Sequence, residues 1–162
     1  GIGKTFFINY FKKIINTTEL KLSLNCKKSN QEIPYAICLQ LINILIYNLI
    51  DKNPTPKKTS KQNVIENWKF HINQNAALFQ PISNLIPNLK KLLPKAHIKK
   101  IPVEYHSSLF LDALEKLTEL FLETEKFIFI TIDNIHNIDK ESQKWLNTLL
   151  NKRKENSIQS HA

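Results

Sequence analysis

The first five residues, Gly1-Ile2-Gly3-Lys4-Thr5, carry the side chains with the clearest chemistry in the chain. They match the last part of a phosphate-binding loop, G-x-x-x-x-G-K-[ST], whose first glycine would lie before Gly1. In such a loop the glycine lets the backbone approach a phosphate, the lysine contacts the β and γ oxygens, and the threonine hydroxyl reaches Mg²⁺. The pattern predicts that residues 1–6, Gly1 to Phe6, hold a nucleotide. Lys4 would also act in catalysis, and Thr5 would bind the metal.

A glycine-containing turn that opens an ordinary helix is the other interpretation of these residues. Composition favours phosphate binding, because both glycines of the chain, Gly1 and Gly3, lie in this loop. After the loop, apolar residues recur at helical spacing and predict a helix packed into a core: Phe6, Phe7, Tyr10, Phe11, Ile14 and Ile15.

A second group of chemical interest is the carboxylate of Asp133, which follows the apolar run Phe127 to Ile132. This run is typical of a strand buried on both faces of a parallel sheet. An aspartate delivered by such a strand beside the loop's threonine would hold Mg²⁺ from the opposite side. Alternatively, Asp133 opens a turn or caps the helix predicted for Asp139 to Asn151. The order of loop and strand in one chain favours the metal role.

The elements that would position these residues indicate an α/β fold. Leu20 to Asn25 alternates apolar and polar residues, which predicts a strand parallel to the one at Phe127 to Ile132. The expected architecture is a three-layer P-loop domain with a long helical insertion over residues 34–124. We expect the chain to be truncated at both ends, with the first strand before Gly1 and later strands after residue 162. The predicted domain covers residues 1–151, and residues 152–162 form a polar tail.

Within the insertion, Tyr35 to Ile50 is apolar on almost every side and predicts a buried core helix. The run is shorter than the roughly 20 residues of a membrane span and carries three amides. Three further apolar helix faces follow: Val64, Ile65, Trp68 and Ile72; then Ile82, Leu85, Ile86, Leu89, Leu92 and Leu93; then Leu109, Phe110, Ala113, Leu114, Leu117, Leu120 and Phe121.

The net charge of +9 comes almost entirely from lysine, since Arg153 is the only arginine. A nucleic-acid partner is conceivable but not favoured, because the lysines are scattered and base reading favours arginine. Cys26 and Cys38 match no zinc or redox spacing, which favours free thiols in a reducing, cytoplasmic environment.

Together these residues resemble the AAA-like signalling ATPases of the STAND class. The likeness rests on Gly1 to Thr5 (the Walker A end), on Ile33-Pro34-Tyr35-Ala36, on Ile132-Asp133-Asn134-Ile135-His136 with Asp139, and on Trp68 with the segment Ile82 to Leu89. Members of this class are fused to kinase, cyclase or transcription-regulator domains. The resemblance implies ATP binding with Mg²⁺, slow hydrolysis and a switch between nucleotide states. Any arginine finger would come from elsewhere in the protein or from another subunit, so self-association is a possible partner interaction.

Asn134 departs from the pattern of this class, which usually has a second acid there to orient the attacking water. An amide cannot act as a base, so hydrolysis is in doubt while binding is not. Asp139 is an alternative source of the base.

His136 either senses the γ-phosphate or is a surface or capping histidine. Two other functions of the chain stay open: a DNA-associated module resembling origin-recognition ATPases, and a degenerate scaffold that binds nothing.

Overall fold

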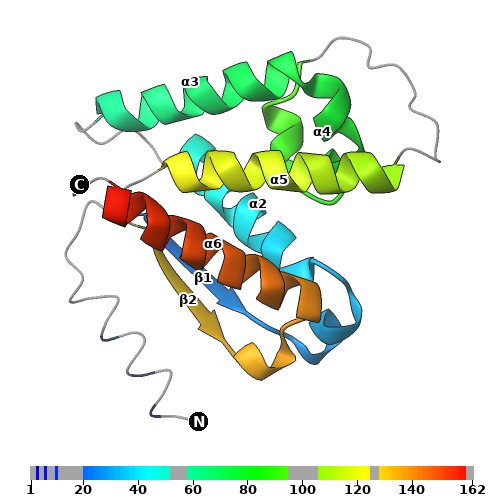
Figure 1. The fold of residues 1–162 in the computed structure, drawn as a ribbon, viewed down its shortest axis with the longest axis vertical. Coiled ribbons are helices and arrows are strands. Elements are labelled where there is room, and N and C mark those ends of the chain that lie inside the picture. The colour runs from blue at the N-terminus through cyan, green and yellow to red at the C-terminus, as the bar shows by residue number, and fades with distance from the viewer. Residues whose placement is uncertain are drawn as a thin grey trace.

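The computed structural model describes residues 3, 6, 10, 20–51, 58–94, 106–124 and 128–159 (Figure 1). The strands are β1 (Leu20–Asn25) and β2 (Ile128–Asp133). The α-helices are α2 (Ala36–Asp51), α3 (Lys58–Gln74), α4 (Ala76–Ser83), α5 (His106–Thr124) and α6 (Lys140–Gln159). Short 3₁₀ helices are η1 (Lys28–Glu32), η2 (Pro87–Lys91) and η4 (Ile135–Asn137).

The two strands pair in parallel, as their sequence patterns predict. The register runs from Leu20 opposite Ile128 to Asn25 opposite Asp133, so both strands end at the same edge of the sheet. In the chain between them lie α2 to α5, the long helical excursion expected from the sequence. The architecture is therefore α/β with a parallel sheet and a large helical part. The three-layer arrangement stays a prediction.

The sheet is covered on one face by α2, which packs directly on β1. Leu22 and Leu24 of β1 are buried, whereas Ser23 and Asn25 are exposed, as the alternating pattern predicts. The prediction that the second strand is buried on both faces is wrong. Its residues 129–133 are only half-buried. Ile130 and Ile132 pack against the core, whereas Thr131 lies on the other face and shares a hydrogen bond of 2.8 Å with the exposed Ser23.

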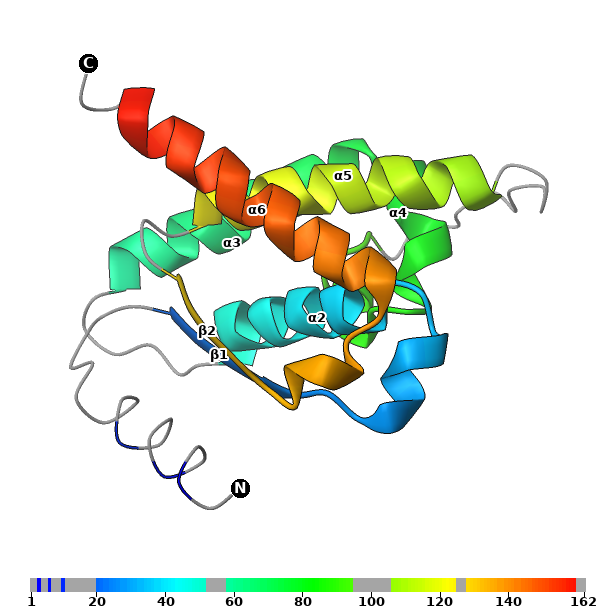
Figure 2. The same cartoon turned by 60° about the horizontal axis from the view of Figure 1, so that its bottom comes forward.

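Helix α2 forms the centre of the core, between the sheet and α5 (Figure 2). Its buried residues lie on nearly every side: Ala36, Ile37, Cys38, Leu39, Leu41, Ile42, Leu45, Ile46 and Leu49. This confirms the predicted core helix. Among the described residues, no helix is long and apolar enough to cross a membrane.

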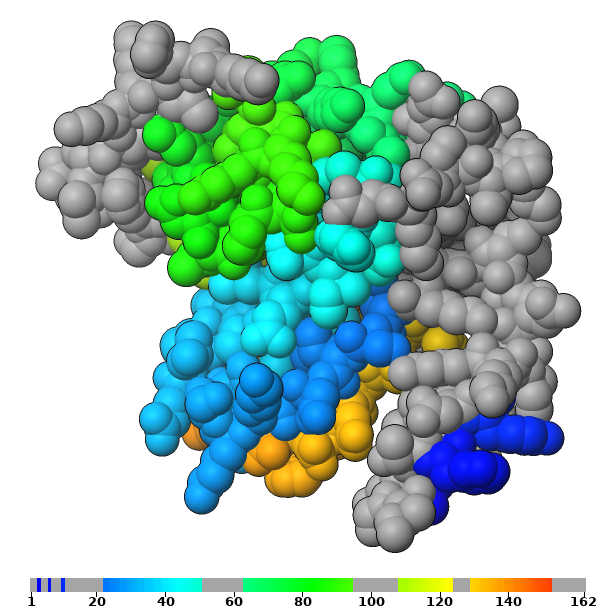
Figure 3. All heavy atoms as spheres, turned by 180° about the vertical axis from the view of Figure 1, so that it is seen from behind, coloured from blue at the N-terminus to red at the C-terminus, as the bar shows by residue number. Residues whose placement is uncertain are grey.

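The helices α3, α4 and α5 form the end of the molecule farthest from the strand-end loops (Figures 1 and 3). Trp68 and Ile72 of α3 are buried, as are Ala113, Leu117 and Phe121 of α5. The apolar stripes at these two places therefore correspond to core-facing helix surfaces, as predicted. The buried Trp145 of α6 packs edge-on against Phe121, with ring centroids 5.8 Å apart.

The apolar stripe from Ile82 to Leu93 is not one helix face. Helix α4 ends at Ser83, and Pro87 opens η2. The reason is local: a proline disfavours helical backbone in the residue before it, and Ile86 has φ −124° and ψ 85°. The amide of Asn43 on α2 holds the break in place, because its Oδ1 accepts the N–H of Asn88 at 2.9 Å.

The first segment differs from its prediction at the described positions. Phe6 and Tyr10 are 72% and 53% exposed, so the expected core packing is wrong for these two residues. They lie four positions apart, and their rings stack on each other with centroids 6.5 Å apart instead of contacting the core. Phe7, Phe11, Ile14 and Ile15 lie outside the described residues. At the other end, α6 continues to Gln159, beyond the predicted helix end at Asn151.

Candidate functional site

The carboxyl ends of β1 and β2 bring two polar residues together. Asn25 and Asp133 are directly paired, so their side chains lie on the same face of the sheet. The ladder continues one step further, because the N–H of Cys26 donates to the carbonyl oxygen of Asp133 at 3.0 Å. Ligands of open parallel sheets bind outside this edge. It is therefore the candidate site.

Asp133 is half-buried, and its Oδ1 accepts the N–H of Asn134 at 2.9 Å. Within the described ranges no further donor contacts this carboxylate, and no group of three or more His, Cys, Asp and Glu could hold a metal ion. A single carboxylate suits Mg²⁺, which keeps several waters and takes substrate phosphate oxygens. The donor chemistry fits the predicted magnesium role of Asp133 but not a metal cage made by protein alone.

Asn134 adopts a left-handed backbone, with φ 53° and ψ 41°. Asparagine is among the few residues that tolerate this conformation. Its Nδ2 donates to Oδ1 of Asn25 at 2.9 Å, which joins the two strand ends through their side chains. The turn directs the chain from β2 into η4 and leaves an amide, which has no basic group, beside the Asp133 carboxylate.

His136 lies exposed on η4. Its carbonyl oxygen accepts a hydrogen bond of 2.8 Å from Nε2 of Gln31. The fold therefore uses the backbone of His136 to link η4 to the η1 region. A role of the imidazole near a γ-phosphate stays a prediction.

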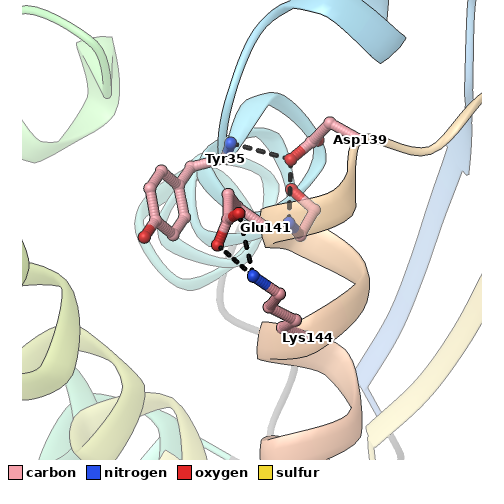
Figure 4. Close-up of polar contacts among 5 residues, drawn as sticks. Tyr35, Asp139, Glu141 and Lys144 are labelled. Atoms are coloured by element: carbon pink, nitrogen blue, oxygen red, sulfur yellow. Dashed lines mark hydrogen bonds and ion pairs between the residues drawn. The ribbon is translucent and has the colours of Figure 1, made fainter.

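Asp139 is a structural carboxylate in this fold. It is 2% exposed, and its Oδ1 accepts the backbone N–H groups of Tyr35 and Ser142, each at 2.8 Å (Figure 4). Its Oδ2 accepts the N–H of Ile37 at 3.4 Å. Both oxygens are thereby occupied at the starts of α2 and α6. This arrangement argues against Asp139 as the catalytic base. It also shows that the cap of α6 is Asp139, so the alternative capping role of Asp133 does not apply.

The two cysteines lie close to this carboxylate. Burial, reinforced by the negative charge of Asp139, raises the pKa of Cys38 well above its ordinary value. The pKa of Cys26 is raised as well, by burial and then by Asp139 and Asp133. Both thiols are free and buried. Burial of this kind keeps both thiols neutral and inert. That they are free agrees with the sequence, in which they match no redox or zinc spacing.

The predicted phosphate-loop residues fall mostly outside the described part of the chain. This holds for Gly1, Ile2, Lys4 and Thr5. Gly3 has helical backbone and is exposed, and a Cβ built on it meets no atom within 4 Å. Phe6 is exposed. The contact between this loop and Asp133 therefore stays a prediction.

The described exposed lysines are spread in ones and twos over several elements, as the sequence suggests. Lys27 and Lys28 lie at the start of η1, Lys69 on α3, Lys90 and Lys91 on η2, and Lys140 and Lys144 on α6. Lysines dispersed in this way are typical of a solvated basic surface. A nucleic-acid groove stays an unfavoured alternative.

Two residues of the site were not predicted from the sequence. Asn25 could have been found, because the carboxyl ends of parallel strands meet at one edge. Tyr35 could not: it has φ 62°, a left-handed backbone that is rare for an aromatic residue. Its N–H is fixed by Asp139, about a hundred residues later in the chain.

A family model described as AAA ATPase domain matches residues 1–159. No curated protein and no solved structure matches the chain.

Proposed function

Because the chain belongs to the AAA ATPase domain family, we propose that it binds ATP with Mg²⁺ and works as a slow, nucleotide-dependent switch. The observation that carries the proposal is that Asp133 and Asn134 follow each other at the carboxyl edge of the sheet, where Oδ1 of Asp133 accepts the N–H of Asn134. The acid that suits the metal is present there. The neighbouring position, which would orient water, holds an amide.

The residues divide into three groups by role: phosphate binding, metal binding and action on the γ-phosphate. Gly1, Ile2, Gly3, Lys4, Thr5 and Phe6 form the phosphate-binding end. Asp133 supplies a carboxylate for Mg²⁺ together with the hydroxyl of Thr5. Mg²⁺, when bound, neutralises charge on the β and γ phosphate oxygens. Lys4 adds a fixed positive charge on the same oxygens. His136 is the proposed group facing the γ-phosphate.

Slow turnover follows from the chemistry of Asn134. A general base contributes about 10²–10⁴ to a rate, and an amide cannot accept the proton from an attacking water. Asp139 does not replace it, because its carboxylate is buried and bonded to backbone N–H groups. A protein that binds ATP well and hydrolyses it slowly spends most of its time in the ATP state.

Such a long-lived state suits signalling. We place the chain in the STAND class, in a cytoplasmic regulator whose effector is a kinase, cyclase or transcription-regulator domain. The support is the resemblance carried by the segments around Tyr35 and Asn134. Self-association belongs to the same proposal, since another subunit would supply an arginine finger.

A binding titration tests the proposal. The affinity of the chain for a fluorescent ATP analogue is measured with Mg²⁺ and with a chelator, for wild type and Asp133→Asn. Asp112→Asn is the matched control, because it removes the same charge from an exposed position on α5. We expect Asp133→Asn to weaken Mg²⁺-dependent binding by about 10- to 100-fold, with no change in Asp112→Asn. Equal affinities for all three proteins, or no binding by wild type, would refute it.

A further inference from the structure

Asp139 joins the two loops that leave the carboxyl ends of the strands. The loop after β1 covers residues 26–35, and the loop after β2 covers residues 134–139. Through one carboxylate, Asp139 at the end of the second loop binds the N–H of Tyr35 at the end of the first (Figure 4). The same Oδ1 atom also accepts the N–H of Ser142 in the first turn of α6.

At the strand ends the same loops are joined a second time. Nδ2 of Asn134 donates to Oδ1 of Asn25, and Nδ2 of Asn137 donates to the carbonyl oxygen of Cys26 at 3.3 Å. Between these contacts and Asp139, Gln31 donates to the carbonyl oxygen of His136. The two loops and their contacts therefore form a closed ring, with the strand ends on one side and Asp139 on the other.

The short segment between Asn134 and Asp139 has little freedom of its own. Its N–H groups at Asn137 and Ile138 donate to the carbonyl oxygens of Asn134 and Ile135, at 2.9 and 3.0 Å. A displacement of Asp139 therefore moves Asn134, the residue that follows the candidate metal ligand and hydrogen-bonds its carboxylate.

The carboxylate is well suited to act as a fixed anchor. In the described part of the chain it makes no ion pair, so its charge is balanced by backbone N–H groups at the N-termini of α2 and α6. Buried acceptors of this kind are costly to leave without donors. Both helices are thus held to one point at the base of the ring.

We propose that Asp139 is a positioning residue for the nucleotide site: it fixes the loop of residues 134–138 and thereby the placement of Asp133 and Asn134. This inference rests on the proposed function, since it assigns Asp133 the metal. In this proposal Asp139 positions the loop in addition to capping α6. Tyr35 takes part in the same contacts, because its strained left-handed backbone turns its N–H toward the Asp139 carboxylate.

Two variants separate positioning from capping. Asp139→Ser keeps a hydroxyl that caps α6 but is shorter than the carboxylate that spans to α2. Ser142→Ala is the matched control: it removes the Oγ that accepts the N–H of Cys38 at 3.0 Å, yet keeps the Ser142 N–H on Asp139. Both changes loosen the start of α2, but only the first breaks the ring.

Amide hydrogen exchange and nucleotide binding are measured on both variants and on wild type. In Asp139→Ser we expect exchange at Asn137 and Ile138 to speed up by about tenfold or more. The gain in nucleotide affinity on adding Mg²⁺ should also shrink by about tenfold. Ser142→Ala should lower thermal stability with neither effect. If Asp139→Ser does not fold, Asp139→Thr, whose hydroxyl also caps α6 and is also shorter than the carboxylate, is judged by the same two readouts.

Unchanged exchange at residues 137 and 138 in the Asp139 variant, or equal changes in both variants, would overturn the inference and leave Asp139 a cap. If wild type binds no nucleotide, the proposed function fails. The exchange comparison still decides, without any ligand, whether Asp139 holds the loop.

Discussion

Asn134 donates a hydrogen bond from Nδ2 to Oδ1 of Asn25 over 2.9 Å, while its own backbone is left-handed with φ 53°. One residue thus turns the chain away from β2 and joins it to the end of β1. The bond is exposed, so its net contribution to stability is expected at the lower end of about 0.5–1.5 kcal/mol. The backbone conformation is the stronger constraint.

Substitutions at Asn134 should therefore follow an unusual order. Asn134→Gly loses the side-chain bond but keeps a backbone that is unstrained with positive φ. Asn134→Ala loses the same bond, and the left-handed conformation costs alanine about 1–2 kcal/mol in the free energy of unfolding. We expect urea unfolding to show Ala as the less stable variant by about that amount. Equal stability of the two variants, or a higher stability of Asn134→Ala than of Asn134→Gly, would contradict the left-handed backbone at this position.

Thr118 on α5 should be sensitive to loss of its hydroxyl. Its Oγ1 donates to the carbonyl oxygen of Leu114 and accepts the buried Nε1–H of Trp145 at 2.7 Å. Thr118→Val leaves this indole without a partner, and we expect a loss of about 1–3 kcal/mol in the free energy of unfolding.

The matched control is Thr148→Val on α6. Its Oγ1 also donates to the carbonyl oxygen four residues earlier, but the residue is exposed. Its loss should stay within about 0.5 kcal/mol. Similar losses in the two variants would mean that the bond between Thr118 and Trp145 contributes little.

The buried thiols predict a loss of stability at alkaline pH. The pKa of Cys38 in the folded protein lies well above the ordinary value of 9.0. Below pH 9.0 the thiol is neutral in both the folded and the unfolded chain, so its contribution to stability is fully present there. As the pH rises from 9.0 toward the folded pKa, the unfolded chain ionises first and stability falls. Between about pH 8 and pH 10, wild type should therefore lose more unfolding free energy than Cys38→Ala.

The comparison concerns the pH slope, because Cys38→Ala also lowers stability at every pH by leaving a small cavity. Cys26→Ala should change the slope less, since the pKa of Cys26 is less strongly raised. Parallel stability curves for wild type and Cys38→Ala would contradict the prediction.

The elements with regular periodicity were predictable because their burial is set by local pattern. The alternation in Leu20 to Asn25 and the helical stripes around Trp68 and Leu117 correspond to buried positions in the structure. The stripe after Ile82 gave a wrong prediction of one continuous helix. Apolar spacing alone takes no account of Pro87, which interrupts the helical backbone.

The candidate site was predictable only where the position of a residue depends on its own strand. The position of Asp133 at the carboxyl edge of the sheet follows from the apolar strand that it ends. The roles of Tyr35 and Asp139 depend on each other across the whole helical part of the chain, so no local pattern indicates them. The sequence offers Asp139 as an alternative catalytic base. Only its burial and its backbone N–H donors identify it as a structural carboxylate.

The central claim is that Asn134 slows hydrolysis in a site that still binds ATP. Asn134→Asp tests it, because aspartate also tolerates the left-handed backbone, and the amide of Asn25 can rotate to donate to the new carboxylate. Single-turnover hydrolysis and ATP affinity are measured for wild type and variant of the full-length protein. We predict a rate increase approaching about 10²–10⁴-fold with little change in affinity. Unchanged hydrolysis in the variant, or wild-type turnover already at about 1 s⁻¹ or above, would contradict the claim.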